Sequence, residues 1–342
     1  MKRGILLMNL GSPDSTKTKD VRRYLNEFLM DEKVIDLPYL PRLLLVQGIV
    51  VPFRAAKSAE AYKMIWTDDG SPLVVMTKKI QEKLQEKVTS PVEIAMRYGN
   101  PTPKTGFDRL LQREPGLEEV IAVPLYPHYA MSSYETAVAH AKETYKKNNY
   151  PFSLKFAAPY YNNDHYITAL AESMRPYLET EYDQLLFSYH GIPGRHIRKS
   201  DSTGAHCLKV ENCCEVASPA HATCYRHQCF TTTKLVTQKL NIPENKYSIS
   251  FQSRLGKGWL EPFTDIRLEE MPNEGIKKLL ILCPAFVSDC LETLEEIAMR
   301  GKETFMDAGG EKYEMIPCLN IHPLWVDTLK LLVEETAENG GL

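Results

Sequence analysis

The stretch GILLMNL (residues 4–10) is a run of apolar side chains that only Asn9 interrupts, and QLLFSY (residues 184–189) repeats the pattern in the second half of the chain. Continuous apolar runs of this length are typical of strands buried on both faces of a parallel sheet. Six further runs rich in Ile, Leu, Val and Tyr are predicted to be strands: residues 92–98, 119–125, 154–157, 247–251, 278–282 and 312–316.

Amphipathic stretches with helical periodicity lie between these runs, at residues 16–29, 74–87, 134–147, 166–177, 231–240, 288–306 and 324–335. Strands that alternate with helices predict an α/β fold in which helices cover parallel sheets. Eight strands favour two doubly wound, Rossmann-like halves, each a roughly four-stranded parallel sheet flanked by helices, over one wide sheet.

The predicted first half spans residues 1–126 and is joined by a C-terminal helix over residues 317–342, while residues 127–316 form the second half. Within the first half, residues 37–53 are apolar and carry three prolines. Their default interpretation is a buried helix, and the alternative is an apolar lip over a pocket that also touches a membrane surface.

Composition excludes several classes of protein. A net charge of −3 and a pI near 6.3 disfavour a nucleic-acid partner. No apolar run approaches the roughly 20 residues of a membrane-spanning helix, and the apolar run at residues 5–8 is too short for a signal peptide. A cytoplasmic location is therefore expected. Neither a G-x-G-x-x-G fingerprint nor a Walker A loop occurs.

Five of the eight cysteines, Cys207, Cys213, Cys214, Cys224 and Cys229, fall within a predicted insertion over residues 199–229. Its part 199–223 has no apolar period and needs ligand bonds to stay ordered. Because disulfides rarely persist in a reducing cytoplasm, these thiols are interpreted as ligands of a metal or an iron–sulfur cluster. The remaining cysteines, Cys283, Cys290 and Cys318, are interpreted as small core residues.

Residues at the carboxyl ends of parallel strands are the first candidates for chemistry. His190 follows one predicted strand and precedes Gly191, which lets the backbone turn. Such an imidazole accepts protons or binds a transition metal near neutral pH, or simply hydrogen-bonds a loop, and the segment alone favours neither.

Two carboxylates, Glu292 and Glu296, lie four residues apart and so share one helix face. They could pass cations or protons. Because Asp289 precedes Glu292 by three residues, a capping box explains one carboxylate by itself and is the preferred interpretation without further context. The aromatic segments around Tyr126 and Trp259 suit a flat apolar ligand, although strand-end aromatics are more often ordinary core.

Taken in order, five segments resemble the ferrochelatase family over essentially the whole chain: ILLMNLGSP (5–13), LYP (125–127), SYHGIP (188–193), FQS (251–253) with Trp259-Leu260, and DCLETL (289–294). The resemblance implies a chelatase-like fold and an enzyme that inserts Fe²⁺ into protoporphyrin IX. Haem forms and two protons are released, as the last step of haem biosynthesis. Porphyrin and ferrous iron are the implied partners.

The resemblance also implies roles for individual residues. His190 matches the family's active-site histidine, assigned to pyrrole proton abstraction or to metal binding, and Glu292 matches its partner carboxylate. Glu296 matches the next acid on the same helix face, and residues 37–53 match the porphyrin-binding lip. The implied porphyrin-lining residues are Tyr126, Arg97 and Trp259.

The insertion resembles the internal four-cysteine [2Fe-2S] segment of one bacterial subgroup. Cys207, Cys213, Cys214 and Cys224 are the favoured ligands, with Cys229, placed at the start of a helix, replacing Cys213 as the alternative. Zinc remains open, because His206, His221 and His227 lie nearby and four thiolates suit it equally. Many relatives carry His where this chain has Cys290, a departure that follows the Gram-negative pattern and puts a second histidine's role in metal delivery in doubt.

Other functions compete with this hypothesis. A coproporphyrin ferrochelatase, or a cobalt or nickel chelatase of tetrapyrrole synthesis, would keep the fold and change the substrate. A tetrapyrrole- or iron-sensing binding protein would use the cysteine loop as its sensor, and a zinc-stabilised interaction module is the weakest alternative. The predicted location is cytoplasmic, with peripheral contact at the inner membrane surface as an open alternative.

Overall fold

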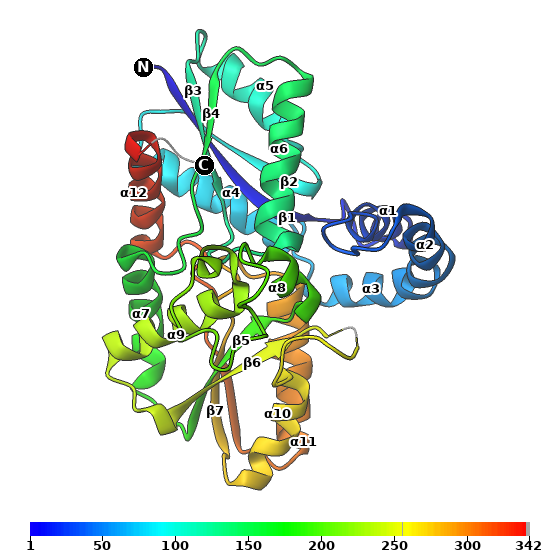
Figure 1. Cartoon of the computed structure of the whole chain (residues 1–342), viewed down its shortest axis with the longest axis vertical. Helices are drawn as coiled ribbons and strands as arrows, with labels where there is room; N and C mark the ends of the chain where they lie inside the picture. The colour runs from blue at the N-terminus through cyan, green and yellow to red at the C-terminus, as the bar shows by residue number, and fades with distance from the viewer. Residues whose placement is uncertain (255, 340–342) are drawn as a thin grey trace. The chain divides into compact units, whose positions relative to one another are not determined.

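The computed structural model describes residues 1–254 and 256–339 (Figure 1). The chain divides into two compact units, each with its own sheet. Unit 1 contains residues 1–126, 131–158 and those from Val326 onward, and unit 2 contains residues 127–130 and 159–325.

Unit 1 is built on a parallel sheet of order β2-β1-β3-β4, in which β1 pairs with both β2 and β3. Helices α4, α5 and α6 pack against β1 and β2. Its elements are β1 (Arg3–Ser12), α1 (Thr18–Leu29), α2 (Tyr39–Leu43), the π-helix η1 (Leu44–Val50), α3 (Val51–Ile65), α4 (Pro72–Gln85), β2 (Val92–Gly99), α5 (Pro103–Arg113), β3 (Glu119–Pro124), the π-helix η2 (Met131–Glu135), α6 (Thr136–Lys147), β4 (Ser153–Phe156) and most of α12 (Pro323–Asn339).

Unit 2 repeats the plan with a parallel sheet of order β6-β5-β7-β8. Its elements are α7 (Asp164–Leu178), β5 (Gln184–His190), α8 (Gly194–Ser200), the 3₁₀ helix η3 (Pro219–Thr223), α9 (Tyr225–Leu240), η4 (Glu244–Lys246), β6 (Tyr247–Gln252), α10 (Thr264–Glu270), η5 (Met271–Glu274), β7 (Lys278–Leu282), the π-helix η6 (Glu292–Gly301), α11 (Lys302–Asp307) and β8 (Lys312–Met315).

All eight predicted strands are present within a few residues of their predicted bounds, and the two four-stranded parallel sheets are confirmed. Continuous apolar runs identified the strands because both faces of each sheet are covered. β1 illustrates this: Ile5, Leu6 and Leu7 are successive residues, and all three are buried.

The predicted division at residue 126 needs correction. β4 pairs in parallel with β3, with Glu119 opposite Ser153, so residues 131–158 belong to unit 1 and not to the second half. The C-terminal share of unit 1 begins at Val326, not at residue 317, and residues 340–342 of that predicted segment lie outside the described residues.

Three helices, α5, α8 and α10, were not predicted, and α3 continues to Ile65, well beyond the segment 37–53. The placement of Cys229 at a helix start was also wrong. α9 begins at Tyr225, so Cys229 lies one turn inside it.

The segment 37–53 forms α2, η1 and the start of α3, which group with α1 beyond the end of β1 in Figure 1. Val46 and Val51 pack against Leu29 and anchor the segment. Large apolar side chains nevertheless point to solvent, and Phe53 is 80% and Leu44 71% exposed. The buried-helix interpretation is therefore wrong, and we call residues 37–53 the lip.

Asp31 anchors the loop that leads into the lip. Its carboxylate accepts hydrogen bonds from the Tyr98 hydroxyl at 2.8 Å and the Lys33 amide at 2.7 Å, and contacts Arg97 and Thr136 more closely. Burial by itself raises the pKa of Asp31, but the bonds from Thr136, Lys33, Arg97 and Tyr98 together hold that pKa below its usual value.

Within the described residues, no helix is both long enough and apolar enough to cross a membrane.

The Asp31→Asn substitution should lower the free energy of unfolding by about 3 kcal/mol at neutral pH, because Arg97 keeps its charge without a counter-ion in a mostly buried site. The depressed pKa of Asp31 means that its stabilising contribution exists above the usual carboxyl pKa and is lost as pH falls through the folded-state value. Urea unfolding of both proteins across acidic pH measures this effect.

Asp108→Asn is the matched control. Asp108 pairs with exposed Lys104 and accepts from the Tyr150 hydroxyl at 2.7 Å at a partly exposed position, so the expected cost is only about 1 kcal/mol. Equal losses in the two variants would contradict the anchoring role of Asp31.

Candidate active site

The carboxyl ends of β5, β6 and β7 bring the predicted chemistry of unit 2 together. β5 lies between β6 and β7, and His190 at its end is in register with Gln252 at the end of β6. Because parallel strands end at the same edge, residues from three distant parts of the sequence become neighbours there.

His190 has a defined tautomer. Its Nδ1 lies 2.7 Å from the carbonyl oxygen of Gly191, and because a carbonyl only accepts, Nδ1 carries the hydrogen. Nε2 then holds the lone pair, which is the atom able to take up a proton or bind a metal. The ring also packs edge-on against Phe286, with centroids 6.1 Å apart.

Gly191 is needed for space rather than for turning. Its amide donates to the carbonyl of Gln252 at 2.8 Å, and a Cβ atom at Gly191 would lie 2.7 Å from that same oxygen. The predicted reason for this glycine, a turn that requires backbone freedom, was therefore wrong, because its φ is not among the positive values. Close approach of β6 to the His190 loop requires the glycine.

Glu292 and Glu296 lie on η6, a π-helix and not the expected α-helix. π-Helical turns occur disproportionately at functional sites. The capping-box interpretation of Glu292 is wrong: Asp289 does not cap the helix but accepts from the Thr293 hydroxyl at 3.0 Å and from Asn320 at 2.6 Å.

Glu296 is held by Ser253, the first residue beyond β6. The Ser253 amide donates to one carboxylate oxygen at 3.0 Å and its hydroxyl to the other at 2.6 Å. Ser253 has φ of 62°, a strained conformation for a residue other than glycine. The two bonds to Glu296 compensate for that strain.

Electrostatics connect the three predicted catalytic residues. Burial raises the pKa of Glu296, and repulsion from Glu292 adds to the effect. The Ser253 bonds and attraction to His190 oppose it without cancelling it. The structure thus brings His190, Glu292 and Glu296 close enough to influence one another, and one carboxyl has an elevated proton affinity.

Gln252 joins the two sides of this group. Its Nε2 donates to the Glu292 carbonyl at 3.3 Å, and its Oε1 accepts from the buried Ser188 hydroxyl at 2.8 Å. Ser188 also bonds Thr264, at 2.9 Å. The network fixes the start of η6 relative to β5.

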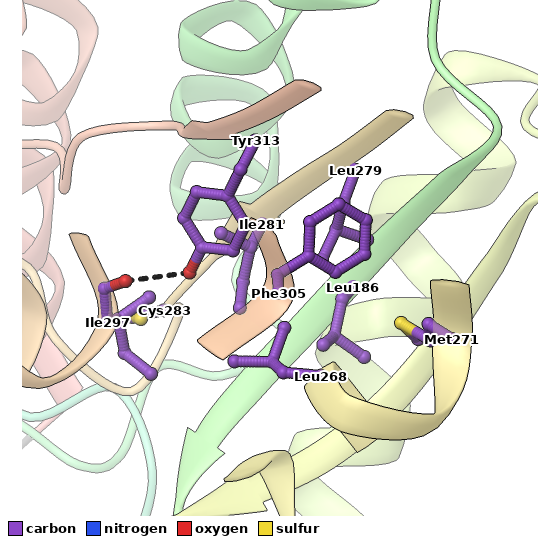
Figure 2. Packing of buried hydrophobic residues seen from close by; sticks show 9 residues of the cluster. All are labelled: Leu186, Leu268, Met271, Leu279, Ile281, Cys283, Ile297, Phe305 and Tyr313. Atoms are coloured by element: carbon purple, nitrogen blue, oxygen red, sulfur yellow. Dashed lines mark hydrogen bonds between the residues drawn. The ribbon is translucent and has the colours of Figure 1, made fainter. Parts of the chain in front are cut away.

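Ile297 of η6 packs into an apolar core (Figure 2). The Tyr313 hydroxyl donates to the Ile297 carbonyl at 2.7 Å and so satisfies a carbonyl of the π-helix. Gly301 lets this contact form, because a Cβ atom there would lie 2.8 Å from the Tyr313 oxygen. The core members are Leu186, Leu268, Met271, Leu279, Ile281, Cys283, Ile297, Phe305 and Tyr313.

The three predicted porphyrin-lining residues fall in different units. Trp259 is in unit 2 and lies against the His190 loop, since its Cε3 is 3.4 Å from where a Cβ of Gly191 would be. Tyr126 and Arg97 are in unit 1. The buried Tyr126 hydroxyl has no hydrogen-bond partner among the described residues, whereas Arg97 donates to Asp31 and, at 2.7 Å, to Thr136.

In the cysteine insertion, four sulfurs converge. The thiols of Cys214 and Cys207 hydrogen-bond the sulfur of Cys224, which lowers the pKa of Cys224 to about 6. Burial raises the pKa of Cys207 to about 12. Cys213 adds to this group electrostatically and accepts from the Leu208 amide at 3.4 Å.

Cys229 stands apart from these four. Its thiol bonds the Tyr225 hydroxyl inside α9, and burial raises its pKa. Each of the three nearby histidines hydrogen-bonds a backbone carbonyl through one ring nitrogen. His206 and His221 bond the Cys213 carbonyl, at 2.6 and 2.8 Å, and His227 bonds the Cys214 carbonyl at 2.7 Å. Arg226 lies 3.5 Å from the Cys214 sulfur.

In this conformation, no group of three or more His, Cys, Asp or Glu side chains within residues 1–254 and 256–339 has the geometry of a metal site. Cys207, Cys214 and Cys224 are arranged as hydrogen-bonding thiols, and the Cys213 sulfur accepts from a backbone amide. The case for Cys207, Cys213, Cys214 and Cys224 as ligands therefore depends on their being four neighbouring thiols. It does not depend on a coordination geometry that is already formed.

Sequence reasoning proposed His190 and both glutamates as site residues but did not assign roles to Gln252, Ser253 or Tyr225. Gln252 and Ser253 form a polar pair directly after an apolar strand, the same signal that singled out His190. Tyr225 carried no comparable signal, because its role depends on a contact 35 residues away.

Known proteins resemble this chain over nearly its full length. The ferrochelatase family profile matches residues 2–337. A ferrochelatase of Pseudomonas entomophila is 50% identical over 96% of this chain and 98% of its own length. One from Opitutus terrae is 49% identical, with 96% and 95% covered.

Solved structures agree on the fold. SirB from Bacillus subtilis with Fe³⁺ superposes with a TM-score of 0.57 at 13% identity, covering 99% of this chain and 97% of its own. A sirohydrochlorin chelatase SirB structure from Bacillus subtilis subspecies spizizenii, in complex with cobalt, gives 0.56. Such low identity speaks only for the chelatase-like architecture, but together with the match along the sequence it leaves no other assignment: the chain belongs to the ferrochelatase family.

Proposed function

We propose that this chain is an enzyme that inserts Fe²⁺ into protoporphyrin IX and so forms haem in the last step of haem biosynthesis. The observation that carries the proposal is the grouping of His190, Glu292 and Glu296 at the strand ends of unit 2, in a chain of the ferrochelatase family. A proton-accepting imidazole and two carboxylates able to bind a metal lie close together there.

The reaction needs both. A neutral porphyrin must lose two pyrrole protons before its dianion can bind Fe²⁺, and the iron keeps its oxidation state throughout. His190 offers the Nε2 lone pair, because Nδ1–H is bonded to Gly191, and it serves as the first proton acceptor.

Glu296 suits the next proton step, since its raised pKa favours the protonated form more than that of an ordinary carboxyl. Glu292, on the same face, supplies carboxylate oxygens that bind ferrous iron and can release it. The two glutamates thus divide metal handling and proton removal between them.

Porphyrin contacts are assigned to three residues. Trp259 offers a flat apolar surface beside the His190 loop. The unpartnered Tyr126 hydroxyl and the Arg97 side chain offer polar groups in unit 1. Porphyrin bound rigidly at its periphery can be bent to expose its nitrogens.

Alternative substrates remain within the same chemistry. Coproporphyrin carries more carboxylates than protoporphyrin, and the apolar lip favours the less charged substrate. Rates with the two porphyrins, and with Co²⁺ or Ni²⁺ in place of Fe²⁺, discriminate among the chelatases. A tetrapyrrole- or iron-sensing binding protein would show no turnover.

The His190→Ala substitution should lower the Fe²⁺-dependent loss of porphyrin fluorescence at least about 100-fold, because the first proton acceptor is removed. His165→Ala is the control, since His165 is exposed at the start of α7. Retained turnover in His190→Ala would refute the catalytic role, provided that both variants still bind porphyrin.

We also propose that the insertion binds a [2Fe-2S] cluster through Cys207, Cys213, Cys214 and Cys224. The donor set fits: four thiols converge and one already has a depressed pKa, whereas Cys229 is engaged with Tyr225. When bound, the cluster supplies one-electron redox chemistry. Iron insertion itself involves no change of oxidation state.

Replacing Cys207, Cys213, Cys214 or Cys224 singly with Ser should abolish the visible absorption and the acid-labile sulfide of the purified protein. Cys229→Ser should keep both. The reverse result at Cys213 and Cys229 would support the alternative ligand set. A colourless wild type that contains zinc would refute the cluster assignment, because zinc has no visible bands.

The lip is proposed to touch an anionic membrane surface from the cytoplasmic side. Its exposed apolar residues, among them Tyr39, Leu40, Leu44 and Phe53, are followed on α3 by exposed Arg54 and Lys57. Apolar side chains next to basic ones are typical of interfacial helices.

Replacing Leu44 and Phe53 together with Asp should lower binding to phosphatidylglycerol vesicles about tenfold or more in cosedimentation, because buried apolar area is lost. Met64→Asp, at an exposed position of α3 outside the lip, is the matched control. Equal binding by all three proteins would rule out membrane contact through the lip.

A further inference from the structure

The residues that flank the cluster cysteines in sequence bind the segment that carries His190. This connection rests on the proposed function and concerns the purpose of the insertion. Three contacts carry it, and all lie within unit 2.

The first contact joins Tyr225 to His190. Tyr225, the next residue after Cys224, donates its hydroxyl to the His190 carbonyl at 2.9 Å. Tyr225 is 4% exposed, and its ring packs edge-on against His128 at 6.0 Å. A buried, packed tyrosine holds that carbonyl in a fixed position.

The second contact involves Cys207. Leu208, the residue after it, places its Cδ1 3.3 Å from where a Cβ of Gly194 would be, so the side chain lies directly against the first residue of α8. Leu208 has φ of 57°, and its amide donates to the Cys213 sulfur. Leu208 thus connects the position of the Cys213 sulfur, through its amide, to the packing against Gly194, through its side chain.

The third contact closes the other end of α8. Thr223, the residue before Cys224, donates its hydroxyl to the carbonyl of Ser200 at 2.5 Å. The segment from His190 to Ser200 is thus held at its start, near its middle and at its end by neighbours of two proposed ligands.

We infer that the cysteine loop positions His190, and that Tyr225 is the positioning residue through which the cluster acts on the catalytic segment. Ligation fixes Cys207 and Cys224, and their neighbours then fix the backbone on which the His190 ring depends. The Gly191 carbonyl, which accepts the hydrogen bond from His190 Nδ1–H, belongs to that same backbone segment. Loss of the cluster frees the loop and loosens this arrangement.

The test compares wild type, Tyr225→Phe, a cluster-free protein made by chelation, and cluster-free Tyr225→Phe. Tyr225→Phe keeps the ring and removes the hydroxyl, with its bonds to the His190 carbonyl and to the Cys229 thiol. It should keep the visible spectrum, lower kcat about fivefold to tenfold and leave KM for porphyrin nearly unchanged. Cluster removal should lower kcat similarly. In cluster-free Tyr225→Phe, kcat should fall no further than in the more impaired of the two single changes. The reason is that both changes act through the Tyr225–His190 hydrogen bond.

Hydrogen exchange gives a readout independent of turnover. Amides of residues 188–194 should exchange faster in the cluster-free protein and in Tyr225→Phe than in wild type. Tyr145→Phe is the matched control, because Tyr145 also donates to a backbone carbonyl, that of Phe152, but in unit 1. It should change neither kcat nor this exchange.

The outcomes separate the proposals. An unchanged kcat and unchanged exchange in Tyr225→Phe, or strictly additive losses, overturn the positioning role while leaving iron insertion and the cluster intact. A wild type without iron–sulfur absorption overturns the cluster and this coupling together. Absence of porphyrin turnover in wild type overturns the enzymatic function, and the exchange data still report whether the loop holds the His190 segment.

Discussion

Parallel pairing of β5 with its two neighbours is the constraint on which the proposed active site depends. It forces three strands to end at one edge, where His190 lies opposite Gln252. Close packing at that edge leaves no room for a side chain at Gly191. Any change that moves β6 relative to β5 therefore moves the imidazole and, through Ser253, the carboxylate of Glu296.

Fixed hydrogen bonds hold the proposed catalytic groups in place before substrate binds. Gly191 sets the tautomer of His190, and Ser253 orients Glu296 at the cost of a left-handed backbone. Gln252 ties the start of η6 to the sheet. Groups that are already oriented need no rearrangement during the reaction. Avoiding that rearrangement accounts for a large part of the rate enhancement of many enzymes. The apolar core beneath η6 keeps the acidic face of the π-helix in place.

The cysteine insertion contacts the His190 segment and is not a structurally separate module. The sulfurs of Cys207, Cys214 and Cys224 form one hydrogen-bonded group, and the histidines of the insertion hydrogen-bond the backbone carbonyls of Cys213 and Cys214. Tyr225, next to Cys224, hydrogen-bonds the His190 carbonyl, and Leu208, next to Cys207, packs against Gly194. An inserted loop without a hydrophobic core gains its order from such ligand and side-chain bonds, so its state can be transmitted to the backbone that it contacts.

The sequence by itself determined the eight strands, the two-sheet α/β class and the family, because continuous apolar runs and ordered motifs are local properties of the chain. It also singled out His190 and Glu292. Tertiary structure alone decided that β4 joins the first sheet, that Glu292 begins a π-helix and not a capping box, and that Tyr225 contacts His190. These features arise from pairing and packing between residues far apart in sequence, which periodicity and propensity do not encode.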